Sequence, residues 1–154
     1  MTTVVFIDTS ILCNLIPVPG RNQDETQVRT ELSSRLSSGH QFILPITSVI
    51  ETGNFVAQLA DGRERLATAT KFESIFRLIC AGNAPWVLHD VAWNQDFLEL
   101  FLDGGGSGMN YVEHAQSRIG AGDLCILTER EHYRARTKID AEVWTLDDGL
   151  NSHN

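Results

Sequence analysis

The chain has 154 residues, of which 42% are hydrophobic and 21% are charged, and its formal net charge at pH 7 is −8. This length predicts one ordinary domain spanning residues 1–154. No apolar run approaches the ~20 residues of a membrane span and no signal-peptide pattern is present, so we expect a cytoplasmic protein without a membrane partner. The acidic charge disfavours polyanion binding over the whole surface and leaves only local basic patches for phosphate contacts.

The first predicted strand is the apolar run Val4 to Ile7, which is rich in β-branched residues. A run without polar alternation is typical of a strand buried on both faces, as in a central parallel sheet. Asp8 follows directly, at the carboxyl end of the strand, where open α/β sheets bind their ligands. A carboxylate buried there needs a partner, and a cation is the usual one.

Short apolar strands alternate with helical patterns along the rest of the chain, which predicts an α/β fold with a parallel sheet. The glycine-rich stretch 103–108 follows a helix rather than a strand, so we expect a flexible loop there and no phosphate cradle. The expected strands are 4–7, 41–44, 86–88 and 141–145. The expected helices are 10–16, 24–38, 48–59 (with Thr47 or Ser48 as N-cap), 63–80, 90–102, 111–118 and 123–130 or beyond.

Four acids occupy corresponding places in this layout. Asp8 ends the first strand, Glu51 lies in the first turn of the helix after the second, Asp123 opens a helix, and Asp147 follows the last strand. In a parallel sheet these positions share one edge, so we expect the four acids to converge on one crevice. Mg²⁺ and Mn²⁺ prefer oxygen ligands, and one or two such ions could activate water and offset the charge on a phosphodiester.

At these positions the chain resembles the PIN-domain family of metal-dependent nucleases. The matching segments are Val4–Ile7 with Asp8-Thr9-Ser10, Ser48-Val49-Ile50-Glu51, Gly122-Asp123-Leu124-Cys125-Ile126-Leu127, and Thr145-Leu146-Asp147. The resemblance implies a three-layer α/β/α sandwich with a mainly parallel sheet. It also implies Mg²⁺ or Mn²⁺ bound by the four acids, and cleavage of RNA. Many small members are dimeric toxins of toxin–antitoxin pairs (VapC-type), so an antitoxin and a homodimer are candidate partners.

Supporting residues follow from the same resemblance and from local charge. Family members often place a small polar residue at the position of Ser10 to hydrogen-bond a ligand, and Thr145 is a second candidate for this role. A basic stretch after the Asp123 helix offers Arg130 and Arg134 for phosphate contact, and Arg118 lies close to Asp123 in sequence. Interleaved acids also allow this stretch to be a solvated helix face.

Three of the four acids also have a purely structural interpretation, and such an interpretation is weakest for Asp8, because a buried strand end seldom carries an unpaired acid. Glu51 could close a capping box with Ser48, Asp123 could interact with a helix dipole, and Asp147 could belong to a turn. Asp148 competes with Asp147 for the role of fourth acid. The alternative function is a PIN-like module that binds RNA or protein without catalysis.

Cysteines and histidines point to no other chemistry. Cys13, Cys80 and Cys125 lie far apart without paired spacing, which excludes a disulfide framework and a cysteine zinc site. The five histidines share no metal-ligand spacing, so a zinc hydrolase is not predicted.

Overall fold

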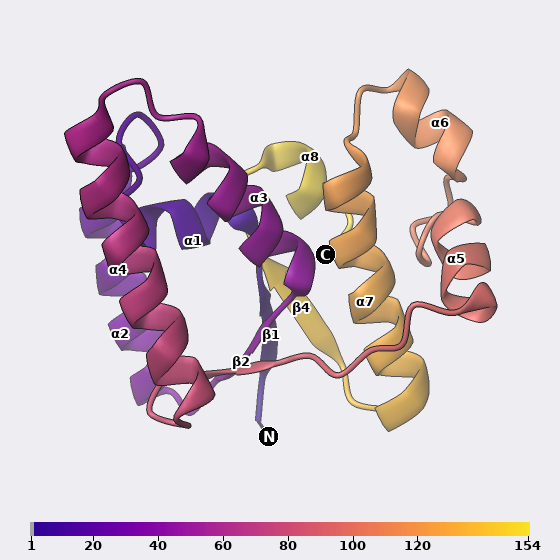
Figure 1. The fold of residues 1–154 in the computed structure, drawn as a ribbon. Helices are drawn as coiled ribbons and strands as arrows, with labels where there is room; N and C mark the ends of the chain where they lie inside the picture. Colours follow the sequence, from indigo (N-terminus) through magenta and orange to yellow (C-terminus); the bar gives the residue numbers. More distant parts are fainter. Residues whose placement is uncertain (1) are drawn as a thin grey trace.

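A computed structural model describes residues 2–154 and has four parallel strands in one sheet, in the order β3-β2-β1-β4. Helices lie on both faces of this sheet, so the fold is the α/β/α sandwich expected from the sequence (Figure 1). The strands are β1 (Val4–Ile7), β2 (Gln41–Leu44), β3 (Trp86–Leu88) and β4 (Ala141–Trp144). The helices are α1 (Thr9–Leu15), α2 (Glu25–Ser37), α3 (Ile46–Ala57), α4 (Gly62–Cys80), α5 (Gln95–Leu102), α6 (Tyr111–Gln116), α7 (Ala121–Thr137) and α8 (Asp148–Asn151).

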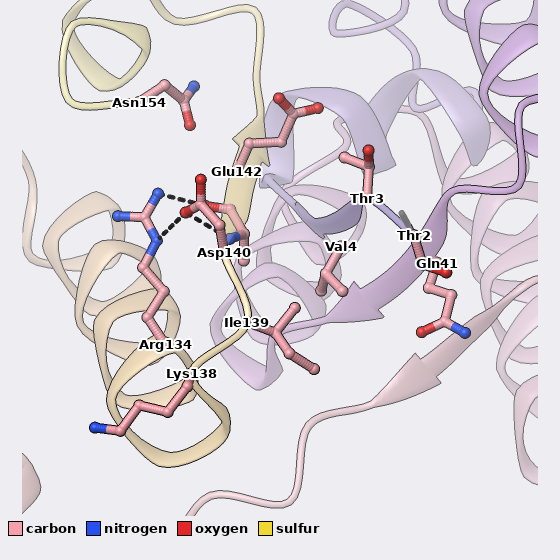
Figure 2. A pocket seen from close by; sticks show the side chains of 11 residues that line it. Thr2, Thr3, Val4, Gln41, Arg134, Lys138, Ile139, Asp140, Glu142 and Asn154 are labelled. Carbon is pink, nitrogen blue, oxygen red and sulfur yellow. Dashed lines mark hydrogen bonds and ion pairs between the residues drawn. The ribbon is translucent and has the colours of Figure 1, made fainter.

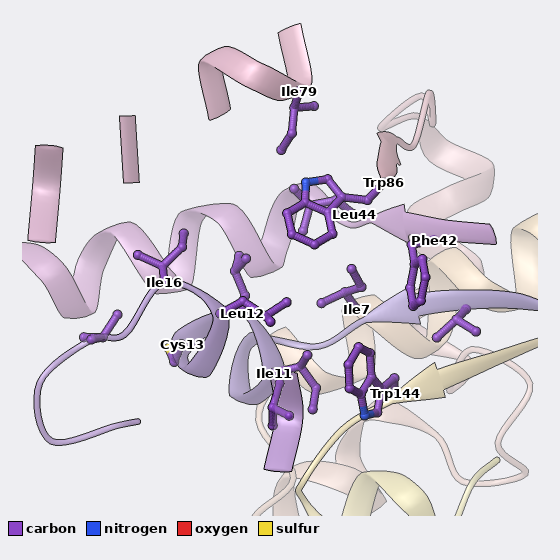
Figure 3. Close-up of a cluster of buried hydrophobic side chains, with 14 of the residues drawn as sticks. Ile7, Ile11, Leu12, Cys13, Ile16, Phe42, Leu44, Ile79, Trp86 and Trp144 are labelled. Carbon is purple, nitrogen blue, oxygen red and sulfur yellow. The ribbon is translucent and has the colours of Figure 1, made fainter. Parts of the chain in front are cut away.

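The central strand β1 divides the apolar core into two clusters, because successive strand residues point to opposite faces of a sheet. Val5 and Ile7 join the larger cluster with residues of α1, α2, α3 and α4, and Figure 3 shows its centre around Ile7. Val4 and Phe6 join the smaller cluster, which is formed with α7. All four residues of β1 are buried, as its unbroken apolar sequence predicts.

None of the helices within residues 2–154 combines the length and the apolar character that a membrane crossing requires.

The predicted start of one helix and the predicted N-cap of another are wrong. Helix α5 begins at Gln95 rather than at residue 90, because the extended Asn94 caps it by accepting from the Phe97 amide at 2.9 Å. The preceding segment crosses in extended form from the strands to the α5–α7 side of the molecule (Figure 1). Helix α3 begins at Ile46 with Pro45 as its N-cap, so neither Thr47 nor Ser48 caps it.

The outer edge of β4 is occupied by a side chain. The Asn154 amide accepts from the Val143 backbone N–H at 2.7 Å and donates to the Val143 carbonyl at 2.8 Å. Arg130 in turn donates to the Asn154 side-chain oxygen and to the His153 carbonyl. These contacts satisfy edge groups of β4 that a neighbouring strand would otherwise pair.

The glycine-rich stretch is packed against α7 and is not the free loop that we expected. Gly104 and Gly105 are buried, and Gly105 has a φ of +57°. A Cβ atom on Gly105 would lie 2.7 Å from the Thr128 hydroxyl and 2.9 Å from the Thr128 amide nitrogen. Glycine is therefore required here by close approach of two backbones as well as by conformation.

A paired glycine substitution tests this packing. Gly39 also has a positive φ, but nothing lies within 4 Å of its missing Cβ. Gly39→Ala is expected to lower the free energy of unfolding by about 1–2 kcal/mol, from the left-handed conformation alone. Gly105→Ala should lower it by about 1–3 kcal/mol more, because the methyl group also displaces Thr128. Urea denaturation of the two variants measures the difference, and equal losses would contradict the packed arrangement.

Candidate active site

The four predicted acids lie at the carboxyl edge of the sheet and line one pocket of about 330 Å³. Asp8 follows β1 directly, Asp147 comes shortly after β4, and Asp123 lies in the first turn of α7. Glu51, which we expected in the first turn of its helix, lies in the second turn, because α3 begins at Ile46. These places are adjacent because parallel strands end at the same edge and the next helices begin there. Asp148 is not among the residues that line the pocket, so Asp147 is the acid that joins the other three.

The Asp8 carboxylate is held through one of its two oxygens. Its Oδ2 accepts from the Thr145 hydroxyl at 2.7 Å, from the Ser10 hydroxyl at 2.8 Å and from the Ser10 amide at 3.3 Å. Oδ1 is buried and has no hydrogen-bond partner among residues 2–154, and Asp8 as a whole is only 3% exposed. An unpaired buried acceptor costs about 1–3 kcal/mol, so Oδ1 is the oxygen that a ligand would satisfy.

Glu51 is directed into the pocket and does not cap its own helix. Ser48 lies inside α3, is fully buried, and donates to the Ile7 carbonyl at 2.7 Å, which excludes the capping-box interpretation. Thr9 donates to Glu51 Oε1 at 3.2 Å. A Cβ on Gly122 would lie 2.8 Å from the Glu51 carboxylate carbon, so the glycine before Asp123 makes room for this side chain.

The remaining two acids differ in their surroundings. Asp123 is half-buried in the first turn of α7, and burial followed by the charges of Asp8, Asp147 and Glu51 raises its pKa to about 7. Burial, and then the charge of Asp8, also raises the pKa of Glu51 against the lowering effect of the Thr9 hydrogen bond. Asp147 is exposed and uses Oδ1 to cap α8 by accepting from the Leu150 amide at 3.0 Å, so it forms part of a helix start rather than a plain turn.

The donor atoms of the pocket are of the chemical type that a hard divalent cation prefers. Its free groups are carboxylate oxygens, one of them buried and unpartnered, and their mutual repulsion is what a bound cation would remove. As the side chains stand, no group of three or more His, Cys, Asp or Glu residues within 2–154 is arranged to hold a metal ion. Mg²⁺ usually retains several waters and is bound through one or two carboxylates, so it does not require such a cage.

The three predicted arginines do not line this pocket. Arg130 is buried, burial lowers its pKa to about 10, and its guanidinium is bonded to the last two residues. Arg134 pairs with Asp140 at 2.9 Å and lines a different pocket, at the opposite edge of the sheet (Figure 2). Arg118 is exposed in the turn between α6 and α7. The phosphate-binding roles expected of these residues are therefore not part of the pocket.

Several residues that line the pocket were not predicted from the sequence. Asn14, Arg21, Gln23 and Asp24 come from the end of α1 and the irregular segment before α2, and Phe55 comes from α3. Asn14 fixes this segment by donating to the Ser10 carbonyl and accepting from the Asp24 amide. In the sequence, only Pro17, Pro19 and Gly20 indicate this segment. They predict a turn, but they do not predict that the turn places its residues beside the acids.

Replacing Asp123 tests the repulsion within the pocket. An unfolded aspartate has a pKa of about 3.9, so between about pH 4 and 7 the folded protein binds more protons than the unfolded chain. The free energy of unfolding therefore falls as pH rises through that window. Without divalent cations, Asp123→Asn is expected to be about 1–2 kcal/mol more stable than wild type at pH 8, allowing for solvent screening of a partly exposed group.

Urea denaturation in EDTA at pH 5 and pH 8 measures this difference. The gain should be smaller at pH 5, where Asp123 of the folded protein is already protonated. Asp148→Asn is the control, because Asp148 is an exposed acid next to the pocket that does not line it. A gain of the same size at both pH values, or from the control, would show that the acids do not repel one another as described.

Comparison with known proteins assigns no family and no function to the chain. No family model matches it, and no curated protein matches it. Its function is therefore inferred from the geometry of its own residues.

Proposed function

We propose that the chain is a metal-dependent endoribonuclease of PIN type, in which Asp8, Glu51, Asp123 and Asp147 hold Mg²⁺ or Mn²⁺. The observation that supports this most is the buried, unpartnered Oδ1 of Asp8, a residue that lines the same pocket as three further carboxylates. A divalent cation would both pair with that oxygen and reverse the local field, which otherwise repels a phosphodiester.

The chain's own residues would hold the acids in place for hydrolysis. Thr145 and Ser10 orient Asp8, and Thr9 orients Glu51. A bound Mg²⁺ or Mn²⁺ would supply a nucleophilic water at neutral pH and offset the charge developing on the phosphate. A covalent route is less well supported, because burial raises the pKa of the Cys13 thiol in this pocket and so disfavours a thiolate.

Other parts of the proposal come from the family resemblance alone. They are the choice of RNA as substrate, a toxin role with a protein antitoxin, and a homodimer. These stay predictions, as does the alternative of a PIN-like module that binds RNA or protein without cutting it. One or two bound ions are equally compatible with four acids.

Asp8→Asn should abolish cleavage while leaving the protein folded. The amide is a poorer cation ligand, so we expect a loss of more than the roughly 10–100-fold that follows removal of a group merely supporting a ligand. Wild type and variant would be incubated with structured and single-stranded RNAs in Mn²⁺, Mg²⁺ or EDTA. Cleavage by wild type only with metal supports the proposal.

Two results would count against the nuclease. Equal cleavage by Asp8→Asn would exclude the acidic site as its source and point to a contaminant. A folded wild type that cuts no RNA under any metal, and whose melting temperature Mn²⁺ does not raise, would favour the binding-module alternative.

Thr145→Val tests the positioning of Asp8. The substitution keeps the shape of the side chain but removes the hydroxyl that donates to Asp8 Oδ2 at 2.7 Å. We expect the Mn²⁺ concentration for half-maximal activity to rise about 10–100-fold, with activity recovering in part at high Mn²⁺. Thr68→Val is a suitable control, because Thr68 is a buried threonine on α4, outside this pocket. An unchanged metal requirement in Thr145→Val would show that this hydrogen bond does not position the ligand.

A further inference from the structure

Arg21 is placed at the mouth of the acidic pocket by a contact with an aromatic ring. Its guanidinium carbon lies 3.4 Å from the centre of the Phe55 ring, and Phe55 follows Glu51 by one turn of α3. The Arg21 amide donates to the Val18 carbonyl at 2.9 Å, which closes the turn after α1. Stacking on the ring restricts an otherwise exposed side chain and holds its planar group over the pocket.

The donors of Arg21 are free. Within residues 2–154 its guanidinium makes no hydrogen bond or ion pair, whereas Arg130 and Arg134 are both bonded to other parts of the chain. Of the described residues that line the pocket, Arg21 is the one lysine or arginine. A guanidinium presents five N–H donors in a fixed fork that matches the oxygens of a phosphate.

Among the described residues, Arg21 forms no ion pair with the carboxylates that line the same pocket. Its guanidinium lies instead on the Phe55 ring, and Phe55 is four residues beyond Glu51 on α3, a rise of about 6 Å along the helix. An offset of this size would let one phosphate lie at the acids and a second at Arg21.

We propose that Arg21 binds the RNA phosphate next to the one being cleaved, so that the site prefers a chain of at least two phosphates. This inference rests on the proposed nuclease function. Contact with a phosphate positions a nucleic acid without reading its sequence. The Phe55 ring is covered by Arg21 and serves to hold the guanidinium rather than to stack a base.

The test compares two substrates in Mn²⁺: a single-stranded RNA oligonucleotide, and bis(4-nitrophenyl) phosphate, which has a single phosphate. Arg21→Ala is expected to raise KM for the oligonucleotide about tenfold, with kcat little changed, because a charge-assisted contact made outside the reacting group is lost. The loss in kcat/KM should be at least about fivefold greater on the oligonucleotide than on the small diester. Arg21→Lys should recover part of the loss.

Arg63→Ala is the matched control, because Arg63 is an exposed arginine on α4 that lies outside the pocket. It should leave KM for both substrates unchanged. An unchanged KM in Arg21→Ala would overturn the inference. An equal loss on both substrates would overturn it too, by placing Arg21 on the scissile phosphate.

Direct binding separates a failure of this inference from a failure of the nuclease proposal. Fluorescence anisotropy would measure the Kd of the labelled oligonucleotide for Asp8→Asn, with and without Arg21→Ala, at several salt concentrations. Loss of one phosphate contact should lower the slope of log K against log salt by about 0.7 for a single strand. If wild type cuts neither substrate but Arg21→Ala weakens binding and lowers this slope, the phosphate contact is supported and the nuclease is not. An unchanged Kd and slope would overturn the contact.

Discussion

The carboxylate of Asp8 joins parts of the chain that are far apart in sequence. It follows β1, starts α1, and receives the Thr145 hydroxyl from the end of β4. Ser10 completes the connection by donating to Asp8 and accepting from the Leu146 amide at 3.0 Å. These bonds fix the segment that leads to Asp147, so the position of the fourth acid depends on the first. All of these donors bond to Oδ2, so Oδ1 has no hydrogen-bond partner among the described residues.

Bringing the four carboxylates together in one pocket destabilises the fold. Burial and mutual repulsion raise the pKa values of Asp123 and Glu51, which means that both prefer to lose their charge on folding. A structural role would not require this, because an apolar or amide side chain would fill the same space without repulsion. Sites that violate the rules of stability in this way are commonly functional. The cation that we propose would convert the repulsion into binding energy.

The sequence predicted the sheet and the acids because both follow from local patterns. Unbroken apolar runs indicate buried parallel strands, and acids at strand ends and helix starts must meet at one edge. Local patterns do not predict which residues of distant elements will contact one another. Arg130 belongs to a basic run that resembles a solvated or phosphate-binding face, yet the structure buries it against the last residues of the chain. The stretch containing Gly105 has the composition of a free loop, and only the approach of α7 shows why glycine is required. Arg21 lies in an irregular turn, whose direction no periodic pattern determines.

The net charge of −8 disfavours polyanion binding, and the proposed phosphate contact at Arg21 bears directly on this objection. An RNA bound as we propose would meet a repulsive surface, so its affinity would have to come from a few well-placed cations. An arginine among the carboxylates would form ion pairs with them and lose its donors to phosphate. In this pocket Arg21 forms no ion pair with the described residues, and its guanidinium lies on the Phe55 ring, where the positive charge is stabilised without a carboxylate. One pocket thus presents acids for the proposed cation and an unpaired guanidinium for an anion, which are the two groups that the proposed binding of a phosphodiester chain requires.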